Sequence, residues 1–107
     1  MKRGDFVTVA LQGDFGKPRP ALVIQSDHAL AHATVTVLPV SSTLVDTPLL
    51  RVTIQPNTSN GLQKPSQVMV DKAVTLKRDK VGASFGSASD AEMLEVERCL
   101  AVFFGIA

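Results

Sequence analysis

Short β-branched segments, each closed by turn-forming residues, recur along most of this chain of 107 residues. The segments Ala33–Pro39 and Leu49–Gln55 alternate between apolar and polar side chains, which is typical of strands with one solvated face. Ala21–Gln25 is instead a continuous apolar run, as expected of a central strand buried on both faces. Further strands are expected at Asp5–Ala10, Ser66–Asp71 and, as a short one, Ala83–Phe85. Strands at this spacing, joined by Gly- and Pro-rich turns, predict a small β-barrel or sandwich.

The C-terminal segment changes to a helical pattern. Ser89-Asp90-Ala91-Glu92 fits a capping box, in which the Ser and Glu side chains satisfy the free amides of a helix start. An apolar stripe follows at helical spacing: Met93, Val96, Leu100 and Phe103. Gly105 is placed to end the helix. The fold class expected from the whole pattern is therefore mainly β with a C-terminal α-helix.

The charge distribution gives only weak support for nucleic-acid binding. Residues 1–89 carry ten Lys and Arg against six Asp and Glu, whereas residues 90–107 carry four acidic residues and one Arg. Many domains that bind no nucleic acid have a basic surplus of this size. The acidic residues lie mostly in the first turns of the expected helix, where the helix dipole favours negative charge.

Length and composition favour one globular domain spanning residues 1–107. The chain is 45% hydrophobic and 20% charged, and no apolar stretch approaches the ~20 residues that span a bilayer. Cys99 is the only cysteine, which excludes an intrachain disulfide and a cysteine-rich zinc site. We therefore expect a cytoplasmic protein with no membrane association.

Arg19 is the most distinctive candidate for chemistry. The segment Gly13–Pro20 does not fit a Walker phosphate loop, because the spacing of its glycines is too short and Pro18 follows Lys17. Pro18 and Pro20 instead hold Arg19 in an extended backbone at the start of a strand. A rigidly held guanidinium suits a phosphate, to which it can donate two hydrogen bonds. The alternative is an ion pair with a surface carboxylate.

Four other polar positions have both a structural and a functional interpretation. His28 and His32 lack a third metal ligand nearby, so a pair of loop residues is favoured; a nuclease with two catalytic histidines would have to use them. The hydroxyl run that begins at Ser41 is typical of a turn, or can donate to a phosphate. Asp71, at a strand end, can form a salt bridge or accept a proton from a ribose hydroxyl.

These elements occur in an order that resembles the MazF/PemK/Kid family of toxin endoribonucleases along nearly the whole chain. The matching segments are Arg3-Gly4-Asp5, Arg19-Pro20-Ala21-Leu22-Val23-Ile24, Leu38-Pro39-Val40-Ser41-Ser42, Arg51-Val52-Thr53-Ile54, Asn60-Gly61-Leu62, Ser66-Gln67-Val68-Met69-Val70-Asp71 and the final helix. No one segment is specific. Their order and spacing carry the resemblance.

The resemblance implies an SH3-like barrel that pairs as a homodimer, with single-stranded RNA held in a groove at the interface. It implies cleavage through the ribose 2′-hydroxyl without a metal or other cofactor, and inhibition by an antitoxin protein that blocks the groove. By position, Arg19 matches the family's catalytic arginine, Ser41 its catalytic threonine, and Asp71 an acidic residue implicated in some members. The expected RNA-binding residues are Lys17, Ser42, Lys64, Ser66 and Gln67.

Three departures from the family pattern affect the expected mechanism. The loop from Gln12 to Pro18 is shorter than usual and lacks the His or Glu-Gln of several members, which leaves the general base open between Asp71 and a histidine. Ser41 keeps the hydroxyl of the commoner threonine. Met69 replaces an arginine of one subgroup, so Arg19 is expected to supply most of the cationic stabilisation of the phosphorane.

Two alternatives remain at this point. A gyrase-poisoning toxin of the CcdB kind shares the expected fold and an aromatic-Gly-Ile tail, here Phe104-Gly105-Ile106, but its tail carries a tryptophan that this chain lacks. A degenerate toxin would bind its antitoxin without cutting RNA. The chain has no Trp or Tyr, and of its five Phe only Phe15 is expected in an exposed loop, so stacking on RNA bases is expected to be sparse.

Overall fold

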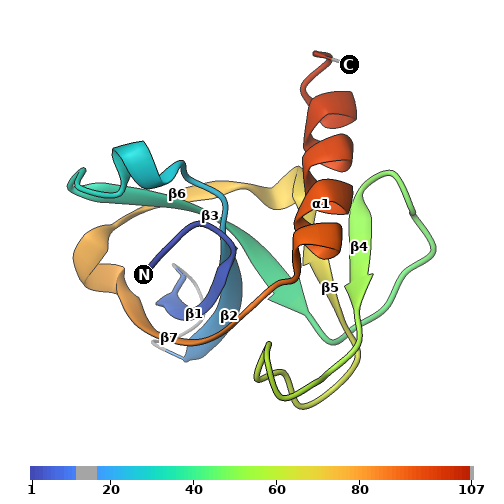
Figure 1. Cartoon of the computed structure of the whole chain (residues 1–107), viewed down its shortest axis with the longest axis horizontal. Coiled ribbons are helices and arrows are strands. Elements are labelled where there is room, and N and C mark those ends of the chain that lie inside the picture. Colours follow the sequence, from blue (N-terminus) through green and yellow to red (C-terminus); the bar gives the residue numbers. More distant parts are fainter. Residues whose placement is uncertain (12–16, 107) are drawn as a thin grey trace.

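The computed structural model describes residues 1–11 and 17–106 (Figure 1). Within these residues, seven strands form one antiparallel sheet. They are β1 (Asp5–Ala10), β2 (Pro18–Val23), β3 (Thr34–Ser41), β4 (Arg51–Ile54), β5 (Ser66–Met69), β6 (Val74–Lys77) and β7 (Val81–Ser87). Three 3-10 turns, η1 (Asp27–Ala29), η2 (Val70–Lys72) and η3 (Arg78–Lys80), connect them, and helix α1 (Asp90–Phe103) follows. The predicted mainly-β class with a C-terminal helix is confirmed.

Strand β3 is the centre of the sheet because it pairs with three partners along its length. Its first half, residues 34–37, pairs with β6, and residues 37–39 pair with β2. Its last two residues, 40–41, pair with β5. The strand therefore passes from the barrel-like part formed with β1, β2, β6 and β7 to the smaller part formed by β4 and β5 beside α1 (Figure 1).

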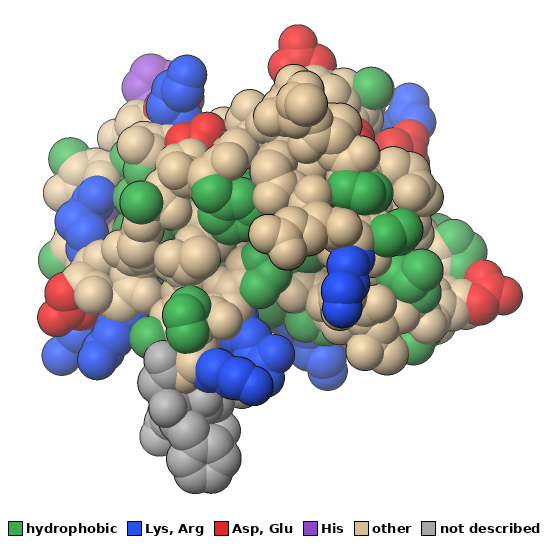
Figure 2. Space-filling model, turned by 90° about the horizontal axis from the view of Figure 1, so that it is seen from below, with side chains coloured by type: hydrophobic (Ala, Val, Ile, Leu, Met, Phe, Trp, Pro, Cys, Tyr) green, Lys and Arg blue, Asp and Glu red, His purple; other side chains and the backbone are tan. Residues whose placement is uncertain are grey.

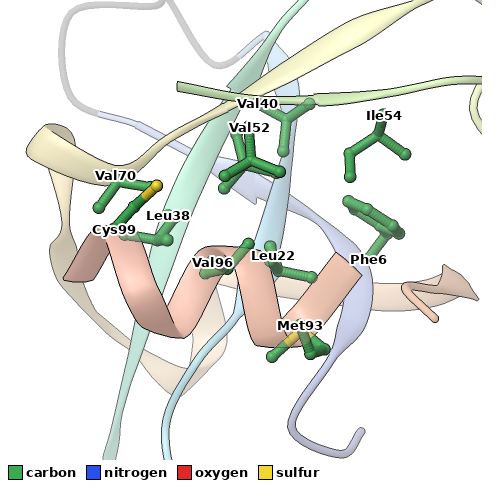
Figure 3. Close-up of a cluster of buried hydrophobic side chains, with 11 residues drawn as sticks. Phe6, Leu22, Leu38, Val40, Val52, Ile54, Val70, Met93, Val96 and Cys99 are labelled. Carbon is green, nitrogen blue, oxygen red and sulfur yellow. The ribbon is translucent and has the colours of Figure 1, made fainter. Parts of the chain in front are cut away.

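Two apolar cores lie on opposite faces of the shared strands. On β3, Val35 and Val37 belong to the barrel core, whereas Leu38 and Val40 belong to the core beneath α1. Helix α1 covers the second core with side chains that point toward the sheet (Figure 3). Strand β2 contributes to both cores, which confirms a strand buried on both faces, although it runs from Pro18 to Val23 rather than over the predicted Ala21–Gln25.

The predicted helix signals are present, with one difference in the buried stripe. Ser89 Oγ accepts from the amide of Glu92 at 3.1 Å, and Glu92 Oε1 accepts from the amide of Ser89 at 2.8 Å, which completes the capping box. Gly105 has a φ of +73° at the helix end. The predicted last member of the stripe was wrong: Phe103 is 45% exposed, and Cys99 is buried in its place.

Cys99 is a structural thiol. Burial raises its pKa, and the nearby charge of Glu95 raises it further. Its Sγ donates to the carbonyl of Pro48 at 3.7 Å. A thiol that is neutral and packed in this way is a poor nucleophile, because reactivity requires the thiolate.

Two further predictions needed correction. Strand β6 was missed, because its four residues are half-buried or exposed and carry no strong apolar signal. Phe85 stacks on Phe6 with ring centroids 6.2 Å apart yet is 37% exposed, and the two C-terminal phenylalanines are also exposed, so Phe15 is not the only candidate for an accessible ring. Phe15 itself lies outside the described residues.

In the part of the chain that the structure describes, no helix is long and apolar enough to span a membrane.

Candidate functional site

A cleft of about 380 Å³ opens where β3 leaves β2 and begins to pair with β5. The last β2–β3 pair is Ala21 with Pro39, and the first β3–β5 pair is Val40 with Val68. Pro20 of β2 and Pro39 of β3 lie at this junction and lack the amide hydrogen that a continued ladder would need. The two halves of the sheet therefore diverge. The polar lining of the gap comes from β2, β5, the end of β3 and the two residues that follow β3: Arg19, Ser41, Ser42, Thr43 and Ser66.

The cleft brings Arg19 and Ser41 together. Arg19 and Ser41 each lie two residues beyond the last β2–β3 pair, and both line the cleft. Arg19 is an exposed residue of β2 between two prolines, as the sequence predicted. Ser41 is the half-buried last residue of β3. A rigid guanidinium and a hydroxyl facing one cleft are suited to bind a phosphate group.

Two of the serines that line the cleft, Ser41 and Ser66, have opposite hydrogen-bonding polarity. Ser41 Oγ accepts from the amide of Thr43 at 3.0 Å, so that bond does not use its hydroxyl proton. Ser66 Oγ donates its proton to the carbonyl of Lys64 at 2.9 Å. Ser41 can therefore donate to a phosphate oxygen, whereas Ser66 can only accept, for example from an amino group of a base. Thr43 was not among the predicted site residues; its backbone amide orients Ser41.

The other predicted RNA-binding residues divide between the cleft and its surroundings. Ser42 lines the cleft and is exposed. Lys17 and Lys64 are exposed and stand just before β2 and β5, each two residues ahead of a polar cleft residue, Arg19 and Ser66. Gln67 does not line the cleft; it is buried and borders a second cavity of about 340 Å³ formed with residues 45–48.

Asp71 is also outside the cleft. Strand β5 ends at Met69, so Asp71 falls in η2 instead of at the predicted strand end. Its carboxylate forms an ion pair with Arg51, and Lys72 Nζ lies 3.9 Å from its second oxygen. The side chains of Arg51 and Asp71 are 16% and 19% exposed.

No described residues form a group of three or more His, Cys, Asp or Glu that could hold a metal ion. His28 lies in η1, and both His28 and His32 are exposed and absent from the cleft lining.

Seen from below, Lys and Arg side chains gather along the lower border of the molecule (Figure 2). The arrangement can bind an anionic polymer through exposed cations and one phosphate through the cleft.

Comparison with known families decides what kind of protein carries this cleft. A family model described as PemK-like, MazF-like toxin of type II toxin-antitoxin system matches residues 2–104. The chain belongs to this toxin family. A curated relative of the toxin, named probable endoribonuclease MazF, from Mycolicibacterium smegmatis, is 43% identical over 108 residues, which cover 100% of this chain and 99% of the relative.

Solved structures share the toxin's fold. An endoribonuclease in complex with its cognate antitoxin, from a mycobacterial species, superposes with a TM-score of 0.85 at 23% identity, covering 100% of this chain and 97% of the other. The Mycobacterium tuberculosis toxin MazF-mt6 gives a TM-score of 0.83 at 22% identity, covering 96% and 98% of the two chains. At these identities the likeness establishes the fold of the toxin and not its site residues.

Proposed function

We propose that this chain is the toxin of a type II toxin–antitoxin system and cleaves single-stranded mRNA at specific sequences without a metal. The observation that carries the proposal is the cleft shared by Arg19 and Ser41. The relative that is 43% identical is named an endoribonuclease, and a structure of the same fold holds its cognate antitoxin. A protein antitoxin that blocks the RNA site is the expected partner of the whole domain, residues 1–107.

In the proposed reaction the ribose 2′-oxygen attacks the adjacent phosphorus and the bond to the 5′-oxygen breaks. The products are a 2′,3′-cyclic phosphate and a 5′-hydroxyl. Arg19 stabilises the charge that develops on the non-bridging oxygens, and Ser41 donates a hydrogen bond to one of them. The guanidinium stays protonated and cannot be the base. The 2′-hydroxyl gives its proton to water, and the leaving 5′-oxygen takes up a proton from water while the guanidinium donates a hydrogen bond to it.

Substrate binding is proposed to use groups around the cleft. Lys17 and Lys64 contact the RNA backbone, and Ser42 and Ser66 contact backbone or base atoms. Exposed lysines suit this task because each neutralised phosphate releases a counterion. Holding the RNA in line for attack contributes much of the rate, because correct orientation removes entropy from the barrier.

We also propose that the chain forms a homodimer through the end of α1. Large apolar side chains are exposed there, from 45% to 80%: Val102, Phe103, Phe104 and Ile106. Contiguous apolar surface of this kind is typical of an interface.

We expect Phe104→Asp to convert a dimer to a monomer in sedimentation equilibrium, because a carboxylate would be buried without a partner. An unchanged mass would contradict this interface.

The proposed location is the cytoplasm, where mRNA is present.

The test is to incubate the purified protein with a long RNA in EDTA and map the ends. Discrete cuts that leave 2′,3′-cyclic phosphates support the proposal. Intact RNA refutes it, and trapped gyrase–DNA complexes would then identify a gyrase poison. Loss of both activities with antitoxin binding retained would identify a degenerate toxin. The family match and the named relative favour the nuclease.

A further inference from the structure

The side chain of Gln67 ties β5 to the segment that follows β3. Gln67 is 6% exposed and pairs with Ser41 in the β3–β5 register. Its Oε1 accepts from the backbone amide of Val45 at 3.0 Å, and its Nε2 donates to the carbonyl of Val45 at 3.0 Å. Nε2 also donates to Thr53 Oγ1 on β4 at 3.2 Å. The amide thus bridges a loop residue to the sheet.

These bonds use the full donor capacity of the amide. A glutamine side chain has two N–H groups, and Val45 and Thr53 accept both. The partners also fix the orientation of the amide, because a backbone N–H can only donate and a carbonyl can only accept. A buried amide with no remaining donor is poorly placed to read a base. The predicted contact between Gln67 and RNA therefore has no support from its position.

The bonds to Val45 copy the contact that a neighbouring strand would make. In an antiparallel pair, one residue exchanges both an N–H and a C=O bond with its opposite residue. Residues 42–50 have no strand pairing, and Gln67 supplies the equivalent two-point contact through its side chain. Residues 43–45 are therefore held at Thr43 by its bond to Ser41 and at Val45 by the two bonds to Gln67.

We propose that Gln67 is a positioning residue for catalysis, an inference that rests on the proposed function. By fixing Val45, Gln67 fixes the turn in which the amide of Thr43 binds Ser41 Oγ. That turn sets the direction in which the Ser41 hydroxyl donates into the cleft. RNA binding depends mainly on exposed cations that Gln67 does not touch. Loss of Gln67 therefore lowers kcat and leaves KM nearly unchanged.

The experiment compares Gln67→Leu with Thr53→Val in the full-length chain. Leucine has a similar size and removes all three bonds, whereas Thr53→Val removes only the bond to β4 and keeps both bonds to Val45. Amide hydrogen exchange of residues 42–46 is measured together with kcat and KM on an RNA oligonucleotide that contains a mapped cut. We expect Gln67→Leu to speed exchange at Val45 and lower kcat, each about tenfold, the effect of losing one net hydrogen bond. Both values stay within about twofold in Thr53→Val.

Three outcomes overturn the inference: unchanged exchange at Val45 in folded Gln67→Leu, faster exchange with unchanged kcat, or a rise in KM alone, which would assign Gln67 to RNA binding. Gln67→Met is the second variant if Gln67→Leu does not fold, because its unbranched side chain follows the course of glutamine and likewise removes both bonds to Val45. Intact RNA with the unaltered protein would refute the proposed function instead. The exchange comparison would still decide whether Gln67 holds the turn.

Discussion

Arg19→Ala is expected to lower RNA cleavage by at least about 10²–10³-fold, the cost of removing one preorganised donor from a developing anion. The guanidinium is the only cationic side chain among the described residues that line the cleft. Because Arg19 is exposed, its truncation is expected to change the free energy of unfolding by less than about 1 kcal/mol. Single-turnover cleavage of an RNA with a mapped cut, together with thermal unfolding, measures both effects.

Two matched variants separate the chemistry of Arg19 from its charge. Arg19→Lys keeps the charge but loses the planar fork, so we expect an intermediate loss of rate. Lys77→Ala removes an exposed cation of β6, away from the cleft, and is expected to leave the rate nearly unchanged. Full cleavage by a folded Arg19→Ala protein would exclude Arg19 from the reaction.

The strands and the helix were largely predictable because their signals are local. Alternation along β3, the apolar run in β2 and the capping box at Ser89 each depend on a few neighbouring residues. The missed strand, β6, shows the limit of such signals. Its register with β3 is set by residues about 40 positions earlier in the chain, and its own four residues carry little apolar pattern.

Some of the residues that line the cleft were among those predicted from the sequence, but the geometry of the cleft was not predictable. The family order identified Arg19 and Ser41, and both line it. The divergence that creates the cleft comes from a change of partner within β3, which no local pattern reports. Gln67 and Asp71 illustrate the same limit. A motif gives their order in the chain, but the face of β5 and the point where β5 ends decide what each side chain meets.

Asp71→Asn is expected to lower the free energy of unfolding by about 1–2 kcal/mol, between the values typical of exposed and of buried ion pairs. The substitution leaves the guanidinium of Arg51 mostly out of solvent without its counter-charge. Lys72 loses a partner too, but its side chain is 59% exposed and contributes little. Chemical denaturation of the two proteins under the same conditions measures the difference.

The double variant Arg51→Met/Asp71→Leu distinguishes a structural from a catalytic Asp71. Replacing both charges with apolar groups leaves neither ion unpaired, so we expect the stability lost in Asp71→Asn to be largely recovered. If the only role of Asp71 is to pair with Arg51, the double variant regains RNA cleavage together with stability. The position of Asp71 outside the cleft predicts this result. A stable double variant that no longer cuts would instead assign Asp71 the catalytic role implied by the family resemblance. The Asp71 carboxylate would then have to reach the RNA from outside the cleft that contains Arg19.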